Sequence, residues 1–478
     1  MDAAAVSKAV FEAADEGRWR QLAEKALKGA GFEETLVSRS DDGIAIQPVY
    51  PRAGPRFAGR GDSEAAWRIV QRVDDPDLER AQRQIAEDIE GGATGLALVF
   101  EGAPNAFGYG LPADANALSH ILDGVPLGDI HMRIDVHPSS RMSLDWMVAC
   151  MARRRVNPAS LSLSFGIDPA AVFAGTGRLR MSIEALRASM PQSLAHFFAM
   201  QVPGVLLEAD GRVYHNAGAT EAQELGAMLS LTAGHLRMFQ EARQPLLYAA
   251  PHIGFSVSAD QDQFLTMAKI RALRLLWTRL QQACGIEASA ASIHAETSMR
   301  MMTKCDAETN ILRSTIACFA AATGGADTIS ILPHTIAHGL PDGFARRLAR
   351  NTQLVLADEA HAGFVSDPGA GAGGIEALTD ALCEAAWAEF QGIEGEGGIL
   401  ESLLAGKFQA RVVEARDRRA AEYRTGRRVL VGSTLYPPKE DRTVTVLDAE
   451  TRPMPTDGAL HCTRLDVARI EDLTGAAA

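Results

Sequence analysis

Two pairs of residues in the sequence combine groups that could move protons. Tyr214 directly precedes His215, and His294 is separated from Glu296 by one residue in an apolar stretch that is typical of a β-strand. Alternating residues of a strand face the same side, so His294 and Glu296 can lie together. Imidazole, carboxylate and phenol are groups that general acid–base catalysis uses. A satisfied internal hydrogen-bond pair is the simpler explanation for His294 and Glu296, and we favour it.

A glycine-rich run and the cysteines are the other candidates for chemistry. The run Asp367–Gly374 resembles a phosphate-binding loop, but it lacks the Lys-Ser/Thr that such loops carry, so we interpret it as a tight turn. The cysteines are scattered without a C-x-x-C pair, which fits neither a zinc site nor a disulfide framework. We therefore expect no metal site and a reducing, cytoplasmic compartment. The six cysteines are Cys150, Cys284, Cys305, Cys318, Cys383 and Cys462.

The elements that would position these residues alternate between strand and helix. Helical periodicity marks LERAQRQIAEDIEGG, QFLTMAKIRALRLLWTRLQQACG and the run DGFARRLARNTQLVLADEA. Seven strand-then-helix units, with an eighth strand near Gly363–Ser366, predict an α/β fold with a (β/α)8 TIM-type barrel. An open doubly wound sheet is the rival, disfavoured because no G-x-G-x-x-G follows the first strand. The seven strand candidates are Gly95–Phe100, Ile130–Val136, Leu161–Phe165, Gly204–Glu208, Leu246–Ser256, Ala291–Glu296 and Thr328–Leu332.

Changes in composition divide the chain into three parts. Residues 1–60 predict a helical N-terminal arm for subunit contact, which ends in a Pro/Gly-rich connector. Residues 61–400 hold the predicted barrel. Residues 401–478 predict a charged helix, then a strand at VLVGSTLY, and then a linker-like tail. We expect no flavodoxin-like domain after this tail, since only about forty residues follow Tyr436.

The overall composition excludes several classes of function. Hydrophobic residues make up 47% and charged residues 22% of the 478 residues, which is ordinary for a globular protein with a large core. The net charge of −13 argues against nucleic acid as a partner. No run of 18 uncharged apolar residues is present, so no membrane span is expected. The N-terminus resembles neither a signal peptide nor a transit peptide.

Several stretches, taken together and in order, resemble the barrel of methylmalonyl-CoA mutases. No single stretch would suffice, but the resemblance covers nearly the whole chain. The stretches are ILDGVPL from Ile121, VYHNAGATEAQELGAMLS from Val213, AKIRALRLLW from Ala268, HAETS from His294, RRLARNTQLVLADE from Arg346, and VLVGSTLY from Val429. The resemblance implies a barrel that encloses an acyl-CoA beside adenosylcobalamin, whose radical chemistry the barrel shields from water.

The cobalamin motif of the family, D-x-H-x-x-G, is absent from this sequence. Asp129 and His131, and likewise Asp135 and His137, match only its first half, because Ile134 and Ser140 stand where glycine is required. Both pairs lie in or beside a predicted barrel strand. We therefore expect that this chain binds no cofactor and that a partner chain carries adenosylcobalamin.

The family's own active-site positions are also altered. Arg72 replaces the tyrosine of the family's R-Q-Y-A-G-F stretch, and Val70 replaces its arginine. Glu296 replaces a glutamine, and its carboxylate would repel a carboxylate substrate. The glutamine of T-I-Q-N-D has no counterpart in SFGID, and Arg178 is a loose match to the arginine of R-N-T-Y. We expect no catalytic residue; the degenerate positions are Arg72, Tyr214, His215 and Glu296, and the substrate-site remnants are His252 and His294.

The resemblance therefore implies a small (beta) subunit without catalysis of its own. Its partner would be a large catalytic mutase subunit that holds cobalamin and acyl-CoA and interconverts (R)-methylmalonyl-CoA and succinyl-CoA as a heterodimer. Two alternatives remain open. One is an autonomous barrel enzyme with a rebuilt site around Tyr214, His215, His294 and Glu296. The other is the substrate barrel of a split mutase with a separate cobalamin chain, against which the altered positions count.

Overall fold

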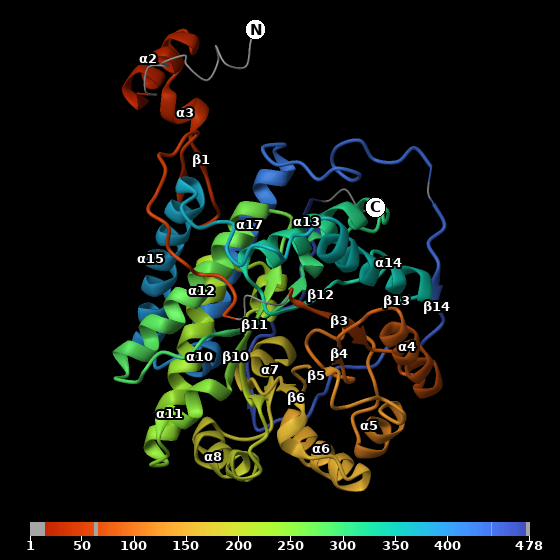
Figure 1. The fold of residues 1–478 in the computed structure, drawn as a ribbon. Coiled ribbons are helices and arrows are strands. Elements are labelled where there is room, and N and C mark those ends of the chain that lie inside the picture. Colours follow the sequence, from red (N-terminus) through yellow and green to blue (C-terminus); the bar gives the residue numbers. More distant parts are fainter. Residues whose placement is uncertain (1–14, 62–65, 441, 475–478) are drawn as a thin grey trace, which may run out of the picture.

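A closed ring of parallel strands forms the centre of the computed structural model, which describes residues 15–61, 66–440 and 442–474 (Figure 1). In ring order the strands are β3 (Arg68–Val73), β4 (Gly95–Leu98), β5 (His131–Ile134), β6 (Ser162–Phe165), β8 (Gly204–Val205) with β9 (Leu207–Asp210), β10 (Ile253–Ala259), β11 (Ser292–Thr297) and β12 (Thr328–Ser330). β8 pairs with β6, and β9 pairs with β10, so this divided strand closes the ring. The predicted (β/α)8 barrel is confirmed.

Two strand predictions were wrong in position. Gly363–Ser366 lies in turns with Phe364 76% exposed, and the eighth strand is β3 at the start of the barrel. β3 pairs with both β12 and β4, which leaves no edge for a further strand. In Leu246–Ser256 the first half forms the short helix α11 (Leu246–Ala249) and a turn, and the strand starts at Ile253, because Pro251 has no N–H for a ladder.

Helices follow the strands and cover the outside of the ring (Figure 1). Aspartate side chains cap four of them: α4 (Leu78–Glu90), α7 (Pro169–Thr176), α12 (Gln263–Ala283) and α14 (Gly343–Leu354). The caps are Asp77, Asp168, Asp262 and Asp342, and each accepts a hydrogen bond from the backbone of the first turn. The three predicted helices are confirmed as α4, α12 and α14 with its π-helical continuation Val355–Glu359. The barrel helices are α4 (Leu78–Glu90), α5 (Ala115–Ile121), α6 (Ser140–Arg154), α7 (Pro169–Thr176), α8 (Ile183–Ala199), α9 (Arg212–Ala217), α10 (Glu221–Glu241), α12 (Gln263–Ala283), α13 (Thr309–Gly324), α14 (Gly343–Leu354) and α15 (Gly373–Gly395).

The N-terminal arm stands away from the barrel (Figure 1). It consists of α2 (Glu16–Ala26), α3 (Phe32–Leu36) and a hairpin of β1 (Ser38–Arg39) and β2 (Ala45–Ile46). α2 buries none of its residues against this chain. The hairpin turn is anchored by Asp41, which accepts from Arg419 and Arg428.

The C-terminal part packs on this chain's own barrel. It begins with α16 (Ile399–Leu404) and α17 (Lys407–Arg424), which confirms the predicted charged helix. The stretch VLVGSTLY is a turn around Gly432, closed by a single bridge between Val431 and Leu435, so the predicted strand was wrong. The tail then adds β14 (Val446–Leu447) to β13 (Leu340–Pro341) and β15 (Leu460–His461) to β7 (Arg178–Leu179), and ends in α18 (Ile470–Thr474).

Backbone hydrogen bonds fix the position of the tail relative to the barrel. Arg452 donates to Gly108, Leu465 to Ala174 and Ala468 to Asn216. These acceptors lie in segments that follow β4, β6 and β9, so the tail crosses the end of the barrel where the strands terminate. In α/β barrels this is the end that carries active sites. No helix among the described residues has the length and apolarity needed to cross a membrane.

Candidate functional site

A cluster of buried charges occupies the interior of the barrel. We call it the axial ion cluster; it contains Arg72, Asp74, Arg133, Asp135, Glu208, Asp210, Arg212 and Glu296, each no more than 3% exposed. The alternation of the strands produces it, because polar residues on β3, β5, β9 and β11 face inward while their apolar neighbours face the helices. On β5, for example, Arg133 points inward between Met132 and Ile134, which belong to the hydrophobic core.

Arg212, at the start of α9, joins opposite sides of the barrel. Its guanidinium donates to Asp210 at 2.6 and 2.9 Å, to Asp135 at 3.2 Å and to Glu296 at 3.1 Å. Asp135 directly follows β5 and Glu296 lies on β11, and four steps around the eight-position ring separate these strands. The Arg212 side chain therefore spans the barrel axis.

The other two arginines complete the cluster. Arg133 on β5 makes a bidentate pair with Glu208 on β9, at 2.5 and 2.6 Å. These two strands stand two positions apart in the ring, with β6 between them. Arg72 donates to Asp74 at 2.6 Å and to Glu296 at 3.4 Å. Ser256 and Ser330 donate to the two glutamates. Charge-assisted bonds of this kind fix both partners, so the cluster holds the interior side chains in one arrangement.

Burial and charge act against each other on the acids of the cluster. Burial would raise the pKa of Asp135, but the guanidinium groups of Arg212 and Arg133 hold it well below its ordinary value. Burial, together with the nearby charges of Glu208 and Asp135, raises the pKa of Asp210 to about 6, despite its bonds to Arg212. Burial also raises the pKa of Asp168, the cap of α7, well above its usual range.

The residues singled out from the sequence fall in different places. Arg72 and Glu296 come together in the axial ion cluster. His294 lies in the barrel interior and bonds to Thr328 at 2.8 Å, so His294 and Glu296 each bond to other partners. Burial holds the pKa of His294 well below its ordinary value. His252 lies before β10 at the opposite end of the barrel, where its ring donates to the Gly204 carbonyl at 2.8 Å.

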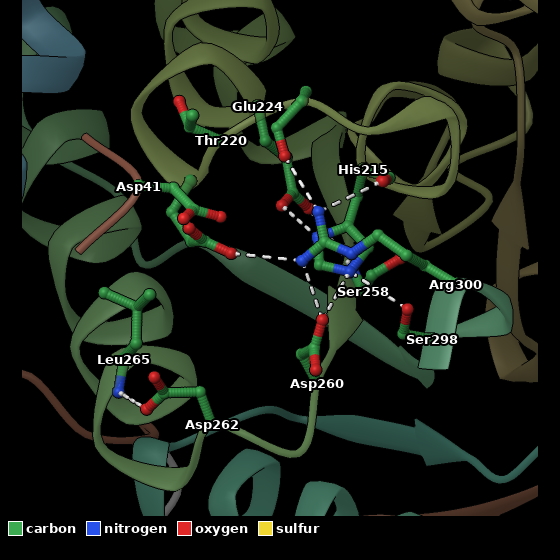
Figure 2. Close-up of polar contacts among 12 residues, drawn as sticks. Asp41, His215, Thr220, Glu224, Ser258, Asp260, Asp262, Leu265, Ser298 and Arg300 are labelled. Carbon is green, nitrogen blue, oxygen red and sulfur yellow. Dashed lines mark hydrogen bonds and ion pairs between the residues drawn. The ribbon is translucent and has the colours of Figure 1, made fainter. Parts of the chain in front are cut away.

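Tyr214 and His215 lie on α9. His215 belongs to a second buried group of polar residues, which is shown in Figure 2. His215 contacts Glu224 at 3.2 Å through Nδ1, and Asp260 at 3.1 Å and Ser298 at 3.0 Å through Nε2. Lys269 donates to Glu224 at 2.7 Å, and Arg300 donates to Asp260 at 2.7 Å. Burial raises the Asp260 pKa, but Arg300 and His215 overcome this and hold it well below the usual value.

This second group has the residue types of a nucleophile, base and acid without access for a substrate. Ser298, His215 and Glu224 are each 0% exposed, so no carbonyl group can approach the serine hydroxyl from solvent. Tyr214 packs its ring against Phe408 at 5.2 Å, and its hydroxyl has no hydrogen-bond partner among the described residues. Burial raises the Tyr214 pKa well above its usual value. In this arrangement the side chains of Ser298, His215 and Glu224 are closed off from solvent.

Both histidines of the partial cobalamin motifs are buried against neighbouring side chains. His131 bonds to Ser162 at 2.9 Å, and its pKa falls to about 3 because it is buried near Arg68 and Arg133. His137 is fully buried beside the rings of Phe100 and Trp146, with ring centroids 4.9 and 5.9 Å from its own, and these two rings also contact each other. No group of three or more potential ligands for a metal ion occurs in the described part of the chain.

Sequence reasoning singled out Arg72 and Glu296 but missed the other six members of the axial ion cluster. Asp135 was considered only as part of an incomplete cobalamin motif, and Asp74, Arg133, Glu208, Asp210 and Arg212 were not singled out. The alternation in IHMRIDV could have indicated this polar interior. It places His131, Arg133 and Asp135 on one face of a strand whose other face is apolar. Three polar residues facing a barrel interior require partners on other strands.

Comparisons with known proteins point to one family. A family model described as methylmalonyl-CoA mutase matches residues 60–459. A methylmalonyl-CoA mutase small subunit from Streptomyces virginiae is 33% identical over 98% of this chain and 77% of its own length. A probable small subunit from Mycobacterium tuberculosis is 38% identical over 88% of this chain and 71% of its own length. The large subunit from Streptomyces virginiae is 24% identical over 91% of this chain and 63% of its own length.

Proposed function

This chain belongs to the methylmalonyl-CoA mutase family, and we propose that it is the small, non-catalytic subunit of a heterodimeric mutase. In this proposal the partner is a large subunit, which binds adenosylcobalamin and the acyl-CoA and interconverts (R)-methylmalonyl-CoA and succinyl-CoA. This chain binds neither and supports the partner's barrel by association. The complex works in the cytoplasm.

The observation that carries the proposal is the axial ion cluster. A barrel that encloses an acyl-CoA needs open space along its axis, whereas Arg212 here bonds to acids on opposite sides of the ring. A substrate that entered the axis would have to separate these pairs and leave charges buried without partners, which costs several kcal/mol for each. Tyr214 and His215, which resemble residues of the family's catalytic site, lie on α9 in contacts with Phe408 and with buried acids.

The N-terminal arm is the part of this chain that we propose to contact the partner. Trp19, Leu22, Ala23 and Ala26 recur at helical spacing on α2, which forms an apolar stripe along one face. α2 buries none of its residues against this chain, and Leu22 is 59% exposed. An apolar stripe on a projecting helix is the feature that a partner's groove would bind.

Replacing Leu22 with aspartate tests the role of the arm. We expect at least a tenfold weaker association with the large subunit, because a charge replaces an apolar contact that would be buried in the complex. The melting temperature of the isolated chain should not change, since Leu22 is exposed there. Gln21→Asp on the neighbouring exposed face is the matched control, and surface plasmon resonance gives both affinities. Equal affinities for the two variants would contradict this role.

The subunit role itself is tested by the mass of the complex. The chain and a large mutase subunit, mixed at equal concentration, should elute together with the summed mass of one copy of each by light scattering. Separate elution of the two chains at micromolar concentration would contradict the proposal. The arm variant provides an internal comparison, because it should shift the equilibrium towards free chains without unfolding either.

A further inference from the structure

A cavity outside the barrel axis is lined by residues of α6, α7 and α8 and of the segments beside them. Its volume is about 400 Å³, within the range in which proteins bind small molecules. Apolar side chains form its floor and walls, among them Ile167, Val172, Leu186 and Met190. The cavity, which is open to solvent on one side, therefore offers an apolar surface to the apolar part of a ligand. The barrel interior, filled by the axial ion cluster, offers no such surface.

Three arginines line the same cavity in a chain whose net charge is −13. Arg141 donates to the Ser189 hydroxyl at 3.0 Å, and burial lowers its pKa because the charged form loses water. Arg178 contacts His461, and Arg180 pairs with Asp457 at 3.1 Å. Asp145 and Asp457 are the acids that line the cavity, so the cations outnumber them.

The C-terminal tail lies over one side of this cavity. Pro455 and Asp457 are part of its lining, and the tail is held nearby by the pairing of β15 with β7. The contact between Asp457 and Arg180 is exposed, with the two side chains 64% and 46% accessible. An exposed pair of this kind contributes little to stability, so an anion could replace the aspartate at Arg180 at small cost.

We propose that this cavity is a binding site for a small amphipathic anion, a carboxylate or phosphate monoester with an apolar tail. The apolar part lies against Val172, Leu186 and Met190, and the anionic head lies at the arginines. Guanidinium groups suit this head because they present forked donors to carboxylate and phosphate oxygens. The tail competes with the ligand through Asp457. This site is independent of the proposed subunit role, since it uses none of the barrel-axis residues.

Octanoate is the probe, and octan-1-ol is its neutral counterpart with the same chain length. Isothermal titration of the full chain, alone and in complex with the large subunit, should show one saturable octanoate site. We expect binding at least tenfold tighter than that of the alcohol, because only the carboxylate pairs with the arginines. Binding without saturation, or equal affinity for the two probes, would overturn the proposal.

Three substitutions locate the site. Val172→Phe fills the cavity and should weaken octanoate binding at least tenfold, and Arg141→Gln should weaken it about tenfold by removing a cation. Asp457→Asn should tighten binding about threefold, because it removes the competing carboxylate. The matched controls are Arg153→Gln, further along α6, and Asp466→Asn in the tail, which pairs with Arg464. Melting temperatures identify any variant that fails to fold.

The experiment distinguishes binding at this cavity from non-specific binding even if one variant fails to fold. If Val172→Phe does not fold, the opposite effects of Arg141→Gln and Asp457→Asn still decide the question. The proposal is supported if Arg141→Gln weakens binding and Asp457→Asn tightens it while both controls bind like the unaltered chain. It is overturned if octanoate affinity is the same in all variants, or if the controls change as much as the cavity variants.

Discussion

Replacing Arg212 with methionine is expected to lower the free energy of unfolding by about 3–5 kcal/mol. Methionine keeps a long side chain, but it leaves Asp135, Asp210 and Glu296 buried without this cation. The loss is large because buried carboxylates cannot regain water while the barrel is closed. Chemical denaturation of the isolated chain, followed by circular dichroism at pH 8, measures the difference between the two proteins.

The pH dependence of that loss gives an independent check. In the unaltered chain the Asp135 pKa lies well below its unfolded value, so this acid stabilises the fold above about pH 4 and loses the effect at lower pH. Without Arg212, the buried carboxylates of Asp135, Asp210 and Glu296 repel one another, which raises the pKa of the two aspartates. Protonating the aspartates removes this repulsion and therefore favours the folded state. Arg212→Met should therefore regain stability as the pH falls from 8 to 5.

Arg237→Met is the matched control for this experiment. Arg237 pairs with Glu394 at 2.5 Å on the surface, where the arginine side chain is 48% exposed. Its removal should cost less than about 1 kcal/mol, since solvent screens exposed pairs. A similar small cost for Arg212→Met would show that the axial ion cluster does not hold the barrel closed.

Gly204→Ala is the second substitution with a large expected effect. Gly204 lies on β8, where the ring closes, with φ of +107°, and an added Cβ would stand 1.9 Å from the Leu163 carbonyl oxygen on β6. The backbone conformation and the clash act together, so we expect a loss of at least about 3 kcal/mol in the free energy of unfolding. Either β6 must move or the closing strand must leave the ring.

Gly392→Ala controls for the general effect of adding a methyl group. Gly392 lies inside α15, and nothing within 4 Å would meet its Cβ. Alanine is the better helix former, so this variant should gain about 0.5–1 kcal/mol. Thermal and chemical denaturation should therefore show a lower free energy of unfolding for Gly204→Ala and a higher one for Gly392→Ala. If Gly204→Ala were as stable as Gly392→Ala, the closure at β8 would not constrain the barrel.

The strand and helix pattern could be predicted where apolar runs are continuous or helical in period. GLALVF and LSLSF became β4 and β6, and the long run before Gly285 became α12. β3 was missed because RIVQRV carries two arginines and a glutamine. In the structure Arg68 is exposed, Gln71 bonds to Asp88, and Arg72 joins the axial ion cluster. The exposed apolar residues Phe364 and Val365 produced the false eighth strand.

The site could be predicted only in part, because its contacts join residues far apart in the sequence. Arg72 and Glu296 were identified individually, but their pairing depends on β3 and β11 standing two positions apart in a closed ring. Arg212 sits after β9 and reaches Asp135 and Glu296 only once that ring forms. Local patterns indicate which strand face is polar, whereas the charge partners depend on the fold.

Turnover by the isolated chain tests the central claim most directly. The purified full chain is incubated with (R)-methylmalonyl-CoA and adenosylcobalamin, and succinyl-CoA is measured by liquid chromatography. The same assay with the large subunit added serves as the positive control. We expect no product above background from the isolated chain and rapid product formation from the complex. Succinyl-CoA produced by this chain alone would contradict a barrel whose axis is closed by Arg212 and its acids.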